Sequence, residues 1–307
     1  MGFAGIQGRF RSVRGWTAGR GPFLASALVL AGALAAARAT RAPPRCKLTL
    51  ELIDSATGKP VPGLVKIEDG AGRAVPLEGL LSRGEGLGAD SPLWRWWVVP
   101  GPVTVSLPAE ALDLEAFGGL ETETARQRLE LGGKAEVRLP LPLRRFHDAA
   151  QRGLASANTH LHLNRLEKPE AERYLREIPR ADGLDLVFLS HLERAGEDAG
   201  YVSNRFTAAD LEGLSRSGVL FANGEEHRHN FGAQGEGYGH VMLLDILRHI
   251  QPVSIGPGIM KRGTDGTPLR AGIEAARGDG ATAIWCHNDW GFEDVPSWLA
   301  ARLDAQN

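Results

Sequence analysis

The chain has 307 residues, 43% of them hydrophobic, and a formal net charge of −2. This length predicts about two globular domains, and the near-zero charge gives no reason to expect a nucleic-acid partner. The two cysteines, Cys46 and Cys286, are too few for a disulfide framework, and a single bridge between them stays open.

Residues 1–39 have the pattern of a secretory signal peptide. Arginines without any acidic residue precede the apolar run 23–37, and two Ala-x-Ala sequences, 35–37 and 37–39, stand at its end. The run is shorter than the roughly 20 residues of a membrane span, so an uncleaved anchor is the alternative. Residues 1–39 hold five of the 35 basic residues and none of the 37 acidic ones, which leaves a formal charge of −7. We expect an exported protein, periplasmic or extracellular, with no membrane contact beyond such an anchor.

Residues 46–143 predict a small all-β sandwich domain. Short stretches that alternate polar and apolar residues, or are rich in β-branched and aromatic residues, are separated by turn residues; they are 47–52, 64–68, 94–99, 103–107 and 135–139. Pro100-Gly101-Pro102 predicts a hairpin between two of them. Trp94, Trp96 and Trp97 could form a carbohydrate platform, although such aromatics more commonly pack in a core or at a domain interface.

Residues 153–307 predict an α/β domain with a parallel sheet or barrel, because strand and helix patterns alternate. Apolar runs indicate strands at 185–190, 219–222, 241–244 and 281–285. Helices are predicted at 168–177, after the capping sequence 207–210, and at 269–276.

Two histidines one residue apart, His160 and His162, are the first sign of chemistry. On an extended strand, residues i and i+2 point to the same face. Both imidazoles can therefore reach one point in space, as a metal centre requires. Imidazole and carboxylate ligands suit Zn, Mn and Fe.

Further candidate ligands follow the predicted strands. His191 comes directly after the strand 185–190, Glu225 and Glu226 follow the next strand by a few residues, and His287 follows the last. His240 stands beside Gly239. In parallel α/β folds the active site forms at the C-terminal ends of the strands, so we expect these side chains to gather there. His249, in contrast, is predicted to be an exposed helix residue.

Several short motifs in this order resemble one superfamily: 159–162, 189–191, 224–226, 237–240 and 285–287. The chain is similar to the polymerase-and-histidinol-phosphatase (PHP) metal-dependent hydrolases, and more closely to the carbaryl-hydrolase-type (CehA/McbA) metallohydrolases. The resemblance implies a distorted β/α barrel with two or three divalent metal ions in a cleft at one mouth.

Carried over residue by residue, the resemblance makes His160 and His162 ligands of one metal. Glu226 would be the bridging carboxylate, with Glu225 as the alternative. His191 resembles the histidine at the end of the family's second strand. The remaining metals would be bound by His240 and His287.

The sequence departs from the family at three points. Asn158 stands where many members have Asp, no histidine follows shortly after His162, and no late Asp-x-His motif precedes Asn307. Fewer strands are predicted than such a barrel needs. We therefore expect a C-terminally truncated chain whose barrel is incomplete.

Two further residues are candidates for catalysis. Asp289, close to His287, is a candidate proton shuttle or a group that hydrogen-bonds to a metal ligand. His227 is a candidate substrate contact, with a hydrogen-bonded loop role as the alternative.

These patterns favour an exported metal-dependent hydrolase. Its metal-activated water would cleave a phosphoester, amide, ester or carbamate bond of a small-molecule or oligomeric substrate. One alternative is a non-catalytic metal-containing binding protein, which the missing C-terminal ligand favours. The other is an amidohydrolase-type barrel, which usually needs a carboxylated lysine; after Lys168 the sequence offers only Lys261.

Overall fold

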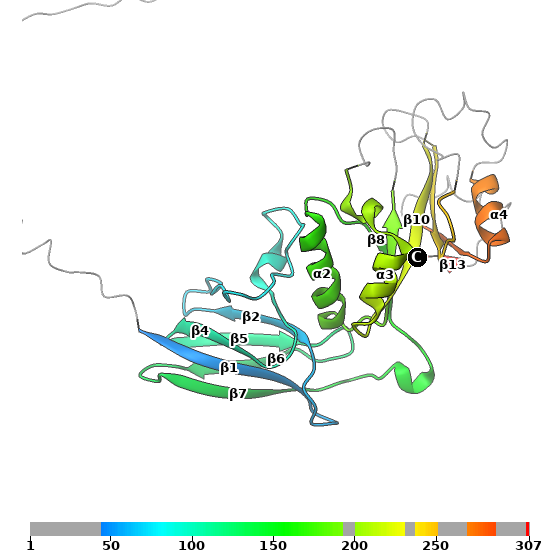
Figure 1. The fold of residues 1–307 in the computed structure, drawn as a ribbon. Helices are drawn as coiled ribbons and strands as arrows, with labels where there is room; N and C mark the ends of the chain where they lie inside the picture. Colours follow the sequence, from blue (N-terminus) through cyan, green and yellow to red (C-terminus); the bar gives the residue numbers. More distant parts are fainter. Residues whose placement is uncertain (1–43, 193–199, 231–236, 251–268, 287–304, 307) are drawn as a thin grey trace, which may run out of the picture. The chain divides into compact units, whose positions relative to one another are not determined.

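A computed structural model describes residues 44–192, 200–230, 237–250, 269–286 and 305–306 (Figure 1). The predicted signal peptide, residues 1–39, lies outside the described residues. Within the described ranges, no helix combines the length and the apolar character that crossing a membrane requires. No disulfide joins Cys46 and Cys286, which are buried in two different hydrophobic clusters.

The first part of the chain forms two antiparallel-rich sheets around one core. One sheet has the strand order β4-β1-β7, and the other has the order β3-β2-β5-β6. All neighbouring strands are antiparallel except β1 and β7, which are parallel. The strands are β1 (Arg45–Asp54), β2 (Gly63–Glu68), β3 (Trp97–Val99), β4 (Val103–Pro108), β5 (Ala111–Phe117), β6 (Ala125–Glu130) and β7 (Glu136–Leu143).

The alternation of β1 explains this arrangement. Cys46, Leu48, Leu50 and Leu52 are buried, while the residues between them are exposed or half-buried. Their cluster includes side chains of β5 from the other sheet, such as Leu112. Since burying one leucine contributes about 1.5–3 kcal/mol, this apolar row is enough to fix which face of β1 turns inward.

The predicted hairpin across Pro100-Gly101-Pro102 is wrong. β3 pairs with β2 in one sheet, whereas β4 pairs with β1 in the other, so the turn carries the chain between the sheets. Trp94 lies in the 3-10 helix η1 (Pro92–Arg95) and not in a strand. Strand-forming residues predict that a segment is extended, but they do not predict its pairing partner.

The three tryptophans make packing contacts. The ring of Trp96 meets that of Phe117 edge to face at 5.0 Å, and Trp97 packs against the sandwich core. The indole N–H of Trp94 donates to the Gly88 carbonyl at 2.9 Å. These contacts favour the packing alternative over a carbohydrate platform.

The second part is mixed α/β, as predicted. Its six-stranded sheet has the order β13-β12-β11-β10-β9-β8. The strands are β8 (Ala157–Leu161), β9 (Leu186–His191), β10 (Leu220–Asn230), β11 (Gly237–Leu244), β12 (Thr282–Trp285) and β13 (Ala305–Gln306). The helices are α2 (Lys168–Ala181), α3 (Ala208–Ser215) and α4 (Arg270–Gly278), with the 3-10 helices η2 (Ala150–Arg152) and η3 (Val202–Arg205).

The sheet is mixed and not parallel throughout. β8, β9 and β10 are parallel neighbours, but β11 is antiparallel to both β10 and β12. Only residues 231–236 separate β10 from β11, and a parallel crossover needs about a dozen residues or more. A closed barrel is not shown by the described strands, so the predicted barrel stays a prediction.

The two faces of this sheet have different surroundings. On one face, Val187 and Leu189 of β9 share a core with α2 and α3, and Val241 of β11 packs with α4. On the other face, Met242 and Cys286 belong to a separate small cluster. Side chains of β10 alternate between these two faces, so adjacent polar residues of this strand lie in different surroundings.

Helix α2 links the α/β part to the β-rich part. Glu167 and Glu170 form a capping box at its start. Its apolar side shares one cluster with Leu64 and Val98 of the β-rich part, and the Arg83 guanidinium lies 3.0 Å from the Asp182 carboxylate at the helix end. Residues from Pro44 onward form one unit, and the predicted division into domains 46–143 and 153–307 stays a prediction.

Candidate metal centre

The His160 and His162 rings come from the end of β8. The pairing of β8 with β9 shifts register between Asn158 and Leu161, so a bulge or irregularity of β8 includes His160. Bulges re-aim side chains and are common next to functional sites. The Nε2 atoms of His160 and His162 lie 3.0 Å apart, so both rings reach one point, as their i, i+2 spacing predicts.

Glu226 comes from the middle of β10, and here the sequence prediction needs correction. Residues 225–227 were predicted to lie in a loop after a strand ending at Ala222, but β10 continues to Asn230. Because side chains alternate along a strand, Glu225 and Glu226 must face opposite sides of the sheet. The structure brings Glu226, and not Glu225, to the two histidines.

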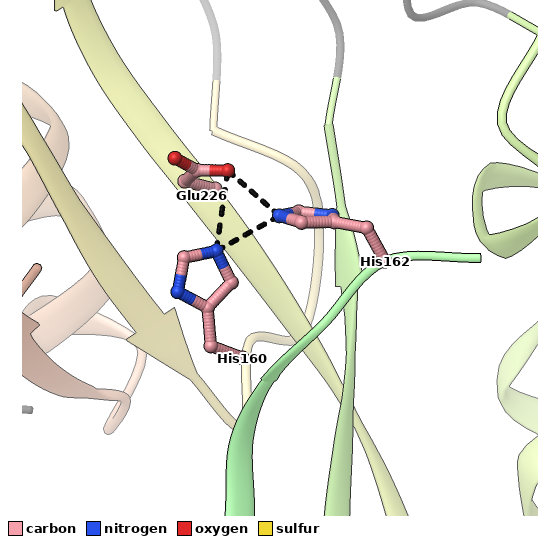
Figure 2. A group of neighbouring side chains, drawn as sticks. All are labelled: His160, His162 and Glu226. Atoms are coloured by element: carbon pink, nitrogen blue, oxygen red, sulfur yellow. Dashed lines mark hydrogen bonds and ion pairs between the residues drawn. The ribbon is translucent and has the colours of Figure 1, made fainter. Parts of the chain in front are cut away.

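Figure 2 shows the resulting triangle of ligand atoms. The Glu226 Oε2 atom lies 2.7 Å from His162 Nε2 and 3.4 Å from His160 Nε2. A zinc ion bonds nitrogen and oxygen at about 2.0–2.2 Å, which puts two neighbouring ligand atoms roughly 3–3.5 Å apart. The three atoms therefore have the spacing of ligands around one small cation.

The hydrogen bonding of His162 sets the charge balance of this triangle. Its Nδ1 lies 3.1 Å from the Ser190 carbonyl oxygen. A carbonyl can only accept, so His162 Nδ1 carries a proton and donates to Ser190, while Nε2 of the same ring faces the Glu226 carboxylate. A carboxylate also only accepts, so either a second proton on the ring or a cation must lie between His162 Nε2 and Glu226. The Glu226 side chain has no exposed surface, so water does not supply this balance of charge.

The second oxygen of Glu226 faces another histidine. His240 on β11 is buried, and its Nε2 lies 3.4 Å from Glu226 Oε1. The carboxylate thus lies between the His160 and His162 pair on one side and His240 on the other. This is the arrangement that a bridging carboxylate needs.

Two contacts hold His160 in place. Its backbone N–H donates to the Asn158 side-chain oxygen at 3.0 Å, and its Nδ1 lies 3.9 Å from the Cys286 sulfur. An aspartate at position 158 would accept the same backbone hydrogen bond, so the departure from the family pattern at this residue leaves the local turn unchanged. Neither contact occupies His160 Nε2, which faces Glu226.

Glu225 and His227 form a separate buried pair on the helix-covered face. His227 Nδ1 donates to Glu225 Oε1 at 2.9 Å, and the Ile250 backbone N–H donates to Glu225 Oε2 at 2.8 Å. Both side chains are about as buried as Glu226. Both oxygens of Glu225 therefore accept from N–H donors. His227 lies against α4, on the face of the sheet opposite to Glu226, whereas the sequence made it a candidate substrate contact.

His191 lies in a different place from the triangle. Its ring stacks on that of His249, with ring centroids 3.5 Å apart. His191 is the register partner of Glu225 on the parallel neighbour β10, which explains why it faces the helix-covered side. His249 is exposed, as predicted, but it lies in the irregular segment after β11 and not in a helix. His287, Asp289 and Lys261 lie outside the described residues.

No protein-family model and no curated protein matches this chain. Among solved structures, it is similar to a protein from Bacteroides vulgatus ATCC 8482 described as a two-domain protein containing a predicted PHP-like metal-dependent phosphoesterase. The identity is 16% and the TM-score is 0.24, over 44% of this chain and 34% of that chain. The match thus spans about a third of that protein, and a similarity this low does not establish a common fold.

Proposed function

We propose that this protein is a metal-dependent hydrolase whose centre is held by His160, His162 and Glu226. The observation that carries the proposal is the triangle of three possible ligand atoms, 2.7–3.4 Å apart, around a carboxylate with no exposed surface. A cation bound there would balance the carboxylate charge, and the histidine side chains are about one-fifth exposed. Water and substrate can therefore approach from the histidine side.

The residues of the chain have distinct roles in this proposal. His160 and His162 would hold the ion, and the Ser190 carbonyl orients His162 for this role. Glu226 would be the carboxylate ligand beside them, and His240, next to its other oxygen, would be a ligand of a second ion. When bound, Zn, Mn or Fe supplies Lewis-acid activation of water and stabilises negative charge on the substrate oxygen.

The finer parts of the proposal rest on the sequence. The resemblance to PHP and carbaryl-hydrolase-type enzymes supports hydrolysis of a phosphoester, amide, ester or carbamate in a small-molecule or oligomeric substrate. It also supports His287 as a further ligand and Asp289 as a proton shuttle. Residues 1–39 support export. We leave Glu225 out of the proposed ligand set because its oxygens accept from His227 and Ile250, and His191 because it lies on the same face of the sheet as Glu225.

The test is an activity screen with defined metal loading. The purified chain is stripped with a chelator, reloaded with Zn, Mn or Fe(II), and assayed on nitrophenyl phosphomonoesters and diesters, an aryl ester, an anilide and an aryl carbamate. We expect turnover of at least one class with at least one metal. Glu226→Gln should abolish it, while Glu225→Gln, which removes the same charge from the other face, should retain it in the folded protein.

Two results would contradict the proposal. Turnover that survives in Glu226→Gln would place the chemistry elsewhere. Metal binding without turnover of any of the five substrates would favour the non-catalytic binding protein instead.

A further inference from the structure

The hydrogen bond from His162 to Ser190 depends on where the end of β9 lies. Ser190 is buried and is the residue before the last in β9. Its carbonyl accepts from His162 Nδ1 and so directs Nε2 of that ring toward Glu226. A shift of this strand end would free the ring to rotate or to change tautomer, and either change removes a lone pair from the triangle.

Asn204 holds this strand end. Its side-chain oxygen accepts from the Leu192 backbone N–H at 2.9 Å, and its side-chain NH₂ donates to the Leu192 carbonyl at 2.6 Å. Leu192 directly follows β9 and is buried. One amide side chain thus bonds both backbone groups of Leu192, two residues beyond Ser190, as a neighbouring strand would.

The 3-10 helix that carries Asn204 also contacts the segment that carries His162. The Ser203 backbone N–H donates to the carbonyl of Leu163, the residue after His162, at 3.3 Å. The Tyr201 ring lies edge-on to the His162 ring, with centroids 5.9 Å apart and planes at 79°. Residues 201–204 therefore contact both segments that the His162–Ser190 hydrogen bond joins, at His162 and Leu163 on one and at Leu192 on the other.

We infer that Asn204 is a positioning residue for the metal centre. It fixes the end of β9, so that the Ser190 carbonyl holds His162 in the Nδ1–H tautomer with Nε2 directed at the ion. The inference rests on the proposed metal centre and deepens it. Loss of a group that orients a metal ligand typically costs about 10–100-fold in metal affinity.

The test compares Asn204→Ala with a control that breaks a similar bond elsewhere. Ser215→Ala removes a side-chain hydroxyl that accepts from the Phe221 backbone N–H at 2.9 Å, at the opposite end of β10. Zinc affinity is measured by competition with a chromophoric chelator. In the metal-free protein, long-range ¹H–¹⁵N NMR reports the His162 tautomer, with the signal assigned by its loss in His162→Ala.

We expect Asn204→Ala to weaken zinc binding about 10–100-fold and to give His162 mixed tautomers. Ser215→Ala should lower the melting temperature with neither effect. Asn204→Asp keeps the acceptor for the Leu192 N–H and loses the donor, so it should fall between wild type and alanine; it is the variant to measure if Asn204→Ala does not fold.

An unchanged zinc affinity and an unchanged tautomer in the folded Asn204 variant would overturn the inference. Failure of the wild-type chain to bind zinc would instead count against the proposed function, and the tautomer of the metal-free protein would still decide the role of Asn204.

Discussion

The two faces of β10 treat neighbouring glutamates in opposite ways. Glu225 and Glu226 are adjacent, and both are almost fully buried. On the helix-covered face, the oxygens of Glu225 accept from His227 Nδ1 and the Ile250 N–H. On the other face, an oxygen of Glu226 lies against the Nε2 atoms of His160 and His162.

The difference separates a carboxylate with N–H partners from one that lies among candidate metal ligands. The hydrogen bonds that Glu225 accepts replace the hydration that it loses on burial. Glu226 lies against two imidazole Nε2 atoms, with which it can hold a metal ion. Burial alone therefore does not distinguish the two glutamates, whereas the groups around each of them do.

The sharpest way to break this comparison is to neutralise each glutamate in turn. Glu226→Gln should reduce zinc affinity by more than the roughly 100-fold that outer hydrogen-bond partners cost, because it removes a ligand atom. Its effect on metal-free stability should be small, since it also removes the desolvation cost of a buried charge. Isothermal titration with zinc and thermal unfolding of the metal-free protein measure the two effects.

The paired variant should behave in the reverse way. Glu225→Gln keeps the size of the side chain but replaces one of its two acceptor oxygens with an NH₂ donor, so that His227 Nδ1 or the Ile250 N–H loses its acceptor. Because hydrogen bonds to buried charged groups contribute about 1.5–3 kcal/mol each, we expect unfolding free energy to fall by about 2–3 kcal/mol. Urea unfolding measures it. A loss of zinc affinity as large as that of Glu226→Gln would erase the distinction between the faces.

The sequence predicts one side of this comparison better than the other. His160 and His162 can be predicted as a pair from the sequence, because residues i and i+2 of a strand point to the same face. Glu225 and Glu226 stay ambiguous because Asn223-Gly224 has the character of a turn, and pairing of β10 with β11 carries the strand through it. The residue pattern of a single segment does not predict which other strand it pairs with.

Other parts of the site leave weaker signals in the sequence. The partner of His162 is a backbone carbonyl, which any residue at position 190 would supply. Asn204 acts on Leu192 from a short 3-10 helix with no motif of its own. The sandwich and the α/β class follow from alternation and helix caps, whereas the antiparallel β11 and the separate partners of β3 and β4 depend on long-range packing.

A smaller effect tests the packing on the helix-covered face. Gly272 of α4 lies against His227, and a Cβ built on it would overlap the imidazole ring. Since Glu225 holds that ring, Gly272→Ala should cost about 1–2 kcal/mol of unfolding free energy through overpacking. Zinc affinity should stay within error of wild type. Differential scanning calorimetry and the zinc titration measure these outcomes, and a rise in stability would mean that His227 moves aside freely.

The smallest expected change in stability concerns Asp210, a half-buried carboxylate in the first turn of α3 that also accepts from hydrogen-bond donors. The Thr207 backbone N–H, together with Lys168 and the Thr207 hydroxyl, lowers the pKa of Asp210 to about 2. Ionised Asp210 therefore stabilises the fold above its unfolded pKa near 3.8, and this contribution is lost as pH falls toward 2. Asp210→Asn should cost about 0.5–1 kcal/mol at pH 7.

The pH dependence distinguishes this capping effect from a change in packing. Melting temperatures of wild type and Asp210→Asn should differ by a constant amount between pH 7 and about pH 5 and should converge below pH 4. A difference that persists unchanged at pH 3 would show that the charge of Asp210 is not its source.

Metal content tests the central claim most directly. The purified wild-type chain and the His160→Ala/His162→Ala double variant are analysed by inductively coupled plasma mass spectrometry, with circular dichroism to establish that both are folded. The triangle of His160, His162 and Glu226 predicts at least one Zn, Mn or Fe per wild-type chain and none in the variant. A folded wild-type chain without metal, or a variant that retains it, would contradict a metal centre at His160, His162 and Glu226.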